Sequence, residues 1–293
     1  MKLLTITILG LFFSINLFAQ KENIKTNNRE VWYEPQPKGM SFIGQGNYKR
    51  TIIVKNDTVF LNESVAPFWM SNEITNKEFR EFTTSLLLEP NDSLCWIDYN
   101  KAISENAGKA EIKSKKYDVC TRYSDASKNI IDTSVFKNDD IKYHNYFTNK
   151  EFDDFPVVGV SNKGAMLYCI WKTKTEVEKI KQEGKNPTLN DYRLPVEEEW
   201  YYAASMPMLK SKTNDRILQK SLSGIKRKNG LLHFSDNVSE WTSTNSNMKL
   251  NNSNVVLGGS WKDNLDFNNR FILDKDSKTN NIGFRIVRSY RSN

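Results

Sequence analysis

The stretch that most constrains the fold runs from residue 258 to residue 285. It reads GGSWKDNLDFNNRFILDKDSKTNNIGFR, and glycine, asparagine and serine recur through the last third of the chain. Such residues favour turns and loops. The clearest strands of this third are residues 255–257 and 283–287, which are mostly apolar. The sequence therefore predicts a strand-poor last third with much irregular backbone, no internal repeat and no domain boundary.

Helix signals occur earlier in the chain. Thr75 or Asn76 can cap a helix. Phe79 and Phe82 lie three residues apart and share one face of it. Glu78 follows Thr75 by three residues, which is the spacing of a capping box. The sequence therefore predicts a first helix that begins here.

Two further helices are predicted. Ser161 starts the second, which ends near Gly184, because glycine suits the position after a helix C-terminus. Pro195 suits the first turn of the third helix, and the acidic residues 197–199 favour a helix N-terminus.

The remaining sequence predicts strands and one long insertion. Residues 37–54 alternate apolar and polar side chains around Gly44 and Gly46, which predicts strand, turn and strand. Residues 89–154 are polar and rich in asparagine, aspartate and lysine, with scattered aromatic residues. We interpret them as a packed, mostly loop insertion on the same domain. Residues 155–160 form a short, buried extended segment.

The N-terminus carries a targeting pattern. Residues 1–19 hold one lysine, an apolar run and a small final residue, as in a cleaved signal peptide. A spanning helix needs about 20 apolar residues, and no second long apolar run follows, so we expect no transmembrane segment in the mature chain. Lipid attachment would need a cysteine directly after the run, but the first is Cys95. We expect an exported protein, periplasmic or outer-membrane-associated, with a flexible arm at residues 20–32 and a single domain at residues 33–293.

Charge and histidine content exclude several functions. The 42 basic and 35 acidic residues give a formal charge of +7, but the lysines are scattered among aspartates and asparagines. A dispersed excess favours solubility and loose attraction to acidic surfaces, so nucleic acid is not an expected partner. His144 and His233 are the only histidines, which excludes multi-histidine zinc or iron catalysis and a Ser-His-Asp set.

The chain has three cysteines. An exported protein can oxidise one pair, and the pairing of Cys95 with Cys120 is favoured because both lie in polar, loop-like sequence. Cys169 lies in an apolar helical run, where a buried and inert thiol is expected.

Short strings in one fixed order link the chain to a known family. They are PKGMSFIGQG at residue 37, NEITNKEF at 72, FPVVGVSNKGAMLYCIW at 155, RLPVEEEW at 193, DNVSEW at 236, GGSW at 258 and NIGFR at 281. Together they resemble the formylglycine-generating enzyme, or sulfatase-modifying factor, superfamily along nearly the whole mature chain. The resemblance implies an α+β fold of the modified C-type-lectin-like kind. Such a fold has two or more helices, small antiparallel sheets and much irregular structure in one domain.

The insertion resembles that of one subgroup of the superfamily. The strings NDSLCW at residue 91 and FDDFPVVGVS at residue 152 look most like the gliding-motility and type IX secretion lipoproteins of Bacteroidetes. Those proteins are non-catalytic members that build periplasmic rings at the outer membrane with a partner protein. This chain lacks their lipid-accepting cysteine, so any anchoring would have to come from a partner.

The resemblance also implies a reaction from which this chain departs. Active members carry a cysteine pair between the GGS and GFR motifs, which binds copper(I) and oxidises a substrate cysteine. Asp263 and Asn268 stand at those positions, and a carboxylate and an amide do not replace soft sulfur ligands. We therefore expect no catalytic residue and no copper. The residues predicted to line a vestigial cleft are Trp261, Asp263, Asn268 and Arg270. The alternative for Asp263 and Asn268 is that they are ordinary polar loop residues.

The string DNVSEW implies a calcium site by the same resemblance. The carbonyls of Asp236 and Val238 and the carboxylate of Glu240 would be the ligands, which are the oxygen donors calcium prefers. His233 stands where a side-chain oxygen is expected, and neutral imidazole is a poor calcium ligand. The alternative is that Asn237 and Glu240 tie a turn to backbone amides.

Charged side chains in the motifs have structural interpretations as well. We expect Arg193 to pair with an acid and Glu199 to hold the helix start; an acid–base pair within residues 197–199 is the alternative and requires burial. Arg270 and Arg285 are expected to be buried and to bond loop carbonyls.

These patterns lead to one favoured function and two alternatives. The favoured one is a non-catalytic exported component that binds or assembles with an envelope protein partner, linked to gliding motility or type IX secretion. The first alternative is an enzyme with altered chemistry, in which Asp263, Glu240 and Arg270 converge in a pocket. The second is a lectin-like module that holds a glycan or peptide on Trp261.

Overall fold

A computed structural model describes most of the chain. The described residues are 34–54, 57–112, 116–136, 141–210, 216–245, 252–263 and 266–291. The predicted signal peptide (1–19) and arm (20–32) lie outside them. Residues 35–291 fall in one compact unit, and the following description concerns that unit. None of the helices in the described ranges has both the length and the apolar character that a membrane span requires.

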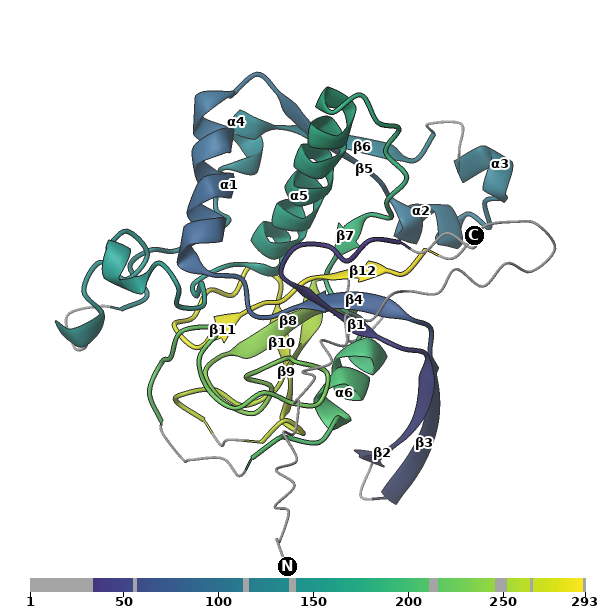
Figure 1. The fold of residues 1–293 in the computed structure, drawn as a ribbon. Helices are drawn as coiled ribbons and strands as arrows, with labels where there is room; N and C mark the ends of the chain where they lie inside the picture. Colours follow the sequence, from purple (N-terminus) through teal and green to yellow (C-terminus); the bar gives the residue numbers. More distant parts are fainter. Residues whose placement is uncertain are drawn as a thin grey trace, which may run out of the picture. The chain divides into compact units, whose positions relative to one another are not determined.

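One antiparallel sheet joins segments from both ends of the domain (Figure 1). Its strands, in spatial order, are β1 (Met40–Ile43), β4 (Phe68–Ser71), β12 (Val287–Ser289) and β7 (Tyr192–Arg193). Trp69 packs with the apolar cluster that contains Phe79 and Tyr168, whereas its neighbours Phe68 and Met70 pack with the cluster that contains Trp200. This follows from the two-residue period of a strand. The sheet therefore separates two apolar cores.

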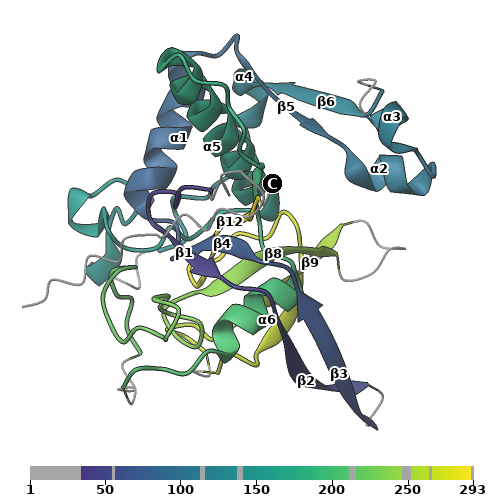
Figure 2. The ribbon, with the colours of Figure 1, turned by 45° about the vertical axis from the view of Figure 1, so that its right-hand side comes forward.

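The three helices predicted from the sequence lie on opposite sides of this sheet (Figure 1, Figure 2). They are α1 (Asn76–Leu88), α5 (Asn162–Gln182) and α6 (Glu197–Ser205). The predicted capping box at Thr75 and Glu78 is confirmed, as is the cap at Ser161. Gly184 follows the end of α5 with φ +72°. Pro195 was predicted to lie in the first turn of α6, which was wrong. Val196 is the N-cap, so Pro195 lies just before the helix.

A second sheet is formed by the last third of the chain. Its strands, in spatial order, are β10 (Arg270–Asp274), β9 (Ser253–Leu257), β8 (Ser239–Asn245) and β11 (Ile282–Gly283). The strand pairs are antiparallel except for β11 with β8. The predicted strand-poor last third was therefore wrong, because cross-strand pairing outweighs the local turn propensity of its Asn and Ser residues.

The predicted strand over residues 283–287 is divided between the two sheets. Residues 284–286 lie between β11 and β12, where Phe284 and Ile286 accept backbone hydrogen bonds from Ile74 and Ser71. Arg285 faces the interior and is fully buried. The break therefore inserts one arginine between the sheets.

The strands predicted within residues 37–54 exist as β1 and β2, but they do not pair with each other. β2 (Gly46–Val54) pairs with β3 (Asp57–Val65) in a long hairpin beside α6 (Figure 2). β1 pairs with β4 instead. The pairing depends on residues beyond the predicted segment.

The insertion at 89–154 was predicted to be mostly loop, and it also contains several short regular elements. Its elements are β5 (Ser93–Ile97), α2 (Tyr99–Ser104), α3 (Lys109–Ile112), β6 (Asp118–Arg122), α4 (Tyr123–Ala126) and the 3₁₀ turns η1 (Ile141–Tyr143) and η2 (Lys150–Phe152). The two strands pair antiparallel, a regular structure that polar composition alone does not exclude.

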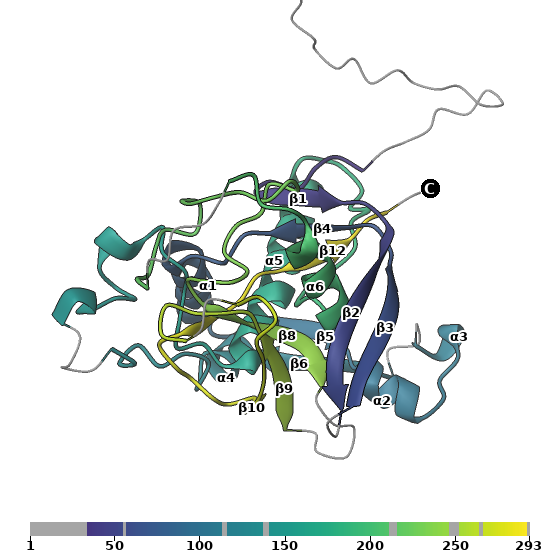
Figure 3. The same cartoon turned by 90° about the horizontal axis from the view of Figure 1, so that it is seen from below.

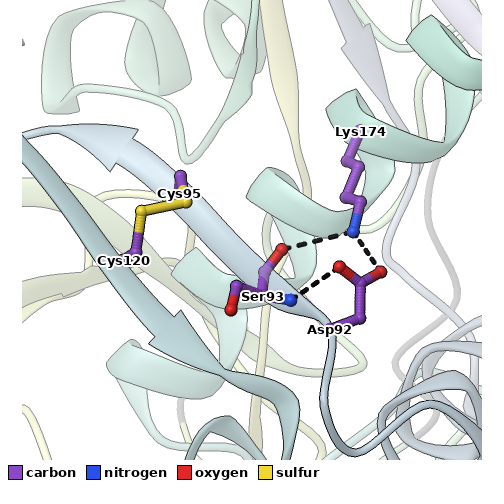
Figure 4. The surroundings of a disulfide bond; sticks show 5 residues. All are labelled: Asp92, Ser93, Cys95, Cys120 and Lys174. Carbon is purple, nitrogen blue, oxygen red and sulfur yellow. Dashed lines mark hydrogen bonds and ion pairs between the residues drawn. A yellow bond between two sulfur atoms is a disulfide. The ribbon is translucent and has the colours of Figure 1, made fainter.

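A disulfide crosses this hairpin (Figure 4). Cys95 lies directly opposite Cys120 in the register, and the two sulfur atoms are bonded. At the start of β5, the Lys174 ammonium of α5 pairs with the Asp92 carboxylate and donates to the Ser93 carbonyl at 3.2 Å. The hairpin is thus closed covalently and fastened to α5.

Candidate functional site

The GGS and GFR motifs meet through one carboxylate. The Ser260 hydroxyl donates to Asp263 Oδ2 at 2.6 Å, and the Asn281 amide donates to the same oxygen at 2.8 Å. The backbone N–H of Asp263 donates to Ser260 Oγ at 3.2 Å, which closes the turn. Gly258 has φ +88°, and a Cβ there would lie 2.6 Å from the Phe234 carbonyl. The Asp263 side chain therefore joins two motif segments.

Trp261 is a member of an aromatic cluster. Its ring lies 5.6 Å from that of Tyr143 and 6.1 Å from that of Phe136, and its indole N–H donates to the Asn280 carbonyl at 3.0 Å. The ring is half-buried. A tryptophan that stacks on a glycan presents an open face, which this packing restricts.

Asn268 and Arg270 have partners of their own. The Asn268 amide donates to Asp266 Oδ1 at 2.9 Å at the surface. Arg270 makes a two-pronged contact with Glu197 of α6, with Nε–Oε1 at 2.8 Å and Nη2–Oε2 at 3.1 Å. Burial opposes ionisation of Glu197, but Arg270 and Arg50 outweigh it and hold the pKa of that carboxyl below its ordinary value.

An open hollow of about 360 Å³ lies beside the turn. Its lining residues are Arg216, Lys262, Asp263, Asn269 and Phe271. Of the four residues predicted to line a vestigial cleft, Asp263 alone is among them. The structure does not bring Trp261, Asn268 and Arg270 together at this hollow.

Glu240 of the DNVSEW string is fully buried and is paired with Arg285. Arg285 Nε and Nη2 donate to its two oxygens at 2.6 Å each, and Trp200 Nε1 donates to Oε2 at 2.6 Å. Arg285 also donates to the Leu232 carbonyl at 2.9 Å, as expected of an arginine that bonds loop carbonyls. The pairing with Glu240 was not predicted, because the two residues are 45 positions apart and no local pattern joins them.

This pairing bears on the implied calcium site. Calcium takes six to eight oxygen ligands, yet both Glu240 oxygens already accept charged or indole hydrogen bonds. The implied ligand from Asp236 is its backbone carbonyl; its carboxylate lies 3.4 Å from His233 Nδ1. In the described part of the chain, no group of three His, Cys, Asp or Glu side chains is placed to hold a metal ion. The Glu240 carboxylate could therefore bind calcium only by giving up its bonds to Arg285 and Trp200.

The neighbouring Asn237 ties its turn to distant segments. Its φ is +61°, its side-chain oxygen accepts from the Gln219 N–H at 2.9 Å, and its carbonyl accepts from the Trp261 N–H at 2.8 Å. The alternative proposed for Asn237, a tie to a backbone amide, is confirmed. For Glu240 the alternative was wrong, because its partners are side chains.

A buried acid and histidine lie behind the same turn. Glu73 accepts from the Asn237 amide at 2.7 Å, while its second oxygen has no hydrogen-bond partner among the described residues. Burial raises the pKa of Glu73 to about 8. For His233, burial acts against the charged form, but the charges of Glu73 and Asp236 outweigh it and raise the pKa to about 8. Glu73 lies within the NEITNKEF string, which gave no sign of burial.

Arg193 and Glu199 form the expected pair. Nη1 and Nη2 of Arg193 donate to the Glu199 oxygens at 2.7 and 2.6 Å, and the Val196 N–H donates to Glu199 Oε2 at 3.1 Å. The carboxylate therefore holds the start of α6. This geometry supports the structural role over an acid–base role.

The three cysteines offer no thiolate at the turn. Cys95 and Cys120 are bonded to each other, and Cys169 is buried in the core around α1 and α5. Burial raises the pKa of the Cys169 thiol well above its ordinary value. A neutral, enclosed thiol is unreactive.

Comparisons with known proteins agree with the motif series. The sequence matches the family described as the sulfatase-modifying factor enzyme 1-like domain over residues 27–220 and 208–290. The structure is similar to CarF, with TM-score 0.52 and 16% identity, over 87% of this chain and 99% of that chain. It is also similar to PvdO from Pseudomonas aeruginosa, with TM-score 0.52 and 12% identity, over 85% of this chain and 94% of that chain. At these identities the two likenesses show the fold alone. Curated proteins give no match.

Proposed function

The chain belongs to the sulfatase-modifying factor enzyme 1-like family, and we propose that it is a non-catalytic member that binds or assembles with a partner protein in a bacterial cell envelope. The observation that carries the proposal is the state of Asp263. This residue stands where active relatives carry a cysteine, and Ser260 and Asn281 both donate to its carboxylate. A carboxylate that accepts both hydrogen bonds stabilises the turn.

The cysteine chemistry supports the same proposal. Oxidation of a substrate cysteine by soft-metal catalysis needs accessible thiolates as ligands. The chain has three cysteines; two form a disulfide and Cys169 is buried with a raised pKa. None of them lies within residues 258–285.

The proposed place of action is outside the cytoplasm. Residues 1–19 have the pattern of a signal peptide, and a disulfide suits an oxidising compartment. We propose a periplasmic or outer-membrane-associated protein. Because no cysteine directly follows the apolar run, a partner would provide any anchor.

The finer proposal is a role in gliding motility or type IX secretion of Bacteroidetes. It is supported by the resemblance of the insertion at residues 89–154 to the lipoproteins of that machinery. The insertion projects the disulfide-closed β5–β6 hairpin together with α2 and α3 (Figure 2). Both cysteines of the hairpin are exposed, which leaves this side available to a partner.

The two alternatives find less support. An altered enzyme would need Asp263, Glu240 and Arg270 to converge, yet each has a different partner: Asn281, Arg285 and Glu197 respectively. A lectin-like module would need an open tryptophan face. The Trp261 ring packs against Tyr143 instead.

The test is the state of the protein in its native host. A tagged full-length chain is cross-linked in intact cells and purified from the envelope fraction, with an unrelated tagged exported protein as control. The proposal expects a specific envelope partner that is absent from the control, and a secretion or gliding defect when the gene is deleted. A chain that fractionates alone and whose loss leaves secretion and gliding intact would contradict it.

A further inference from the structure

We propose that the outer edge of β10 is a docking surface for an extended acidic segment of a partner protein, which adds a strand to the β10–β9–β8–β11 sheet. The inference rests on the proposed binding role and specifies the chemistry of the partner. It starts from the position of the strand: in the described part of the chain, β10 is the last strand on its side of the sheet (Figure 3).

The register fixes which backbone groups face outward. The Gly258 N–H donates to the Asn269 carbonyl and the Lys275 N–H donates to the Asn252 carbonyl, each at 2.9 Å. Both pairs continue the register of β9 and β10. Hydrogen-bonded pairs alternate along an antiparallel ladder. The backbone N–H and C=O groups of the odd-numbered residues of β10 therefore point toward β9. The N–H and C=O groups of Arg270 and Ile272 therefore point away from the sheet.

The side chains of this edge are unusually apolar for an open strand. Phe271 is 39% exposed and Ile272 is 54% exposed, on opposite faces of β10. Edge strands are normally protected by a charge, a proline or a bulge at their centre. β10 carries charges only at its ends, Arg270 and Asp274, and its pairing with β9 is regular. An added strand would cover both apolar side chains.

Charge indicates the kind of segment that fits. The hollow at the Phe271 end is lined by Arg216 and Lys262, both exposed. Among the described residues that line it, the carboxylate is that of Asp263, which already accepts from Ser260 and Asn281. The free charge of the hollow is thus positive, which favours a carboxylate on the incoming segment. Backbone pairing provides affinity and the side chains provide selectivity, as in other strand-addition complexes.

The test uses the mature protein and two defined probes, the capped hexapeptides (Glu-Val)₃ and (Lys-Val)₃. Amide hydrogen exchange is followed by NMR with and without each probe. The proposal expects the Ile272 and Arg270 amides to exchange rapidly in the free protein, and to slow about tenfold with the acidic probe at saturation. The basic probe leaves them unchanged.

Variants separate the edge from the rest of the surface. Ile272→Pro removes an outward N–H without touching the β9 ladder, and it weakens the acidic probe about fivefold. Ile272→Asp keeps the N–H and adds a repelling charge, so it also weakens binding. Lys262→Glu places a repelling negative charge in the hollow and also weakens binding of the acidic probe. The control Leu88→Lys changes another exposed apolar residue, 76% exposed at the end of α1, and leaves binding unchanged.

Three results would overturn the inference. They are an Ile272 amide that is already protected in dilute free protein, equal effects of the acidic and basic probes, and no slowing with the acidic probe. Protection that grows with protein concentration alone identifies a second copy of this chain as the occupant and also overturns it. None of these results bears on whether an envelope partner is recovered from cells, so the proposed function stands or fails separately.

Discussion

The buried pair of Arg285 and Glu240 gives the sharpest test of how this fold is held together. Both side chains are fully buried, and two hydrogen bonds of 2.6 Å join them. Arg285→Met leaves the Glu240 carboxylate without its counter-charge, which costs about 3–5 kcal/mol in a buried pair. It also removes the donor to the Leu232 carbonyl, a loss of about 1–3 kcal/mol. We expect the free energy of unfolding to fall by about 5 kcal/mol.

The assay is urea unfolding of the mature protein, followed by tryptophan fluorescence. The double variant Arg285→Met/Glu240→Gln removes both charges and keeps an acceptor for the Trp200 indole N–H, so it should regain about 2 kcal/mol or more relative to Arg285→Met alone. If the single variant does not fold, recovery of folding in the double variant is the expected result. The control Lys128→Met removes an exposed lysine from Asp125 and should cost about 0–1 kcal/mol. Two results would contradict the proposed role of this pair. One is a loss of unfolding free energy below about 1 kcal/mol for Arg285→Met, and the other is a loss in the double variant equal to the sum of the losses in the two single variants.

Further predictions concern pH, the disulfide and the GGS turn. The folded-state pKa values of Glu73 and His233 are raised from 4.5 and 6.5 to about 8, so folding binds protons, and the free energy of unfolding should decrease as pH rises between 4.5 and about 8. Urea unfolding across this range should show the decrease, and Glu73→Gln should flatten it; an unchanged slope in the variant would contradict the assignment. Reduction of the Cys95–Cys120 bond, whose partners are 25 residues apart, should destabilise the hairpin by roughly 3 kcal/mol on the chain-entropy model, seen as faster amide exchange in β5 and β6; unchanged exchange would count against it. Gly258→Ala should lower the thermal midpoint by several degrees, because the residue has φ +88° and its Cβ would lie 2.6 Å from a backbone oxygen; a midpoint equal to that of the wild type would show that the turn relaxes.

Local signals predicted the helices well. The capping box at Thr75 and Glu78 and the cap at Ser161 depend on residues within one turn of the helix, so the sequence contains the whole interaction. Pro195 was misplaced because Val196 holds the N-cap position, and Glu199 bonds the Val196 N–H instead.

The sheets were predicted poorly for the opposite reason. β12 pairs with β4 and β7, which come from distant parts of the chain. No local sequence pattern predicts which strands pair. The break at Arg285 arises because its guanidinium reaches Glu240, 45 residues away. Strand propensity depends on such packing, so residues 283–287 looked like one continuous strand.

The site was predictable in its composition but not in its geometry. The absence of cysteine from residues 258–285 can be seen in the sequence alone. Asp263 accepts hydrogen bonds from Ser260 and Asn281, which are 21 residues apart in two different motifs. Only the fold brings these two residues together. Glu73 was missed because nothing in its local sequence indicates burial.

We propose above that the chain has the fold of its family without the reaction of its active members. The most direct measurement is mass spectrometry of a cysteine-containing sulfatase peptide after incubation with the purified mature protein, copper(I), a reductant and oxygen. We expect no aldehyde above the level of a protein-free control. Aldehyde formation by the wild type that is lost in Cys169→Ser would contradict it, because a thiol that we place in the core would then be acting as a catalyst.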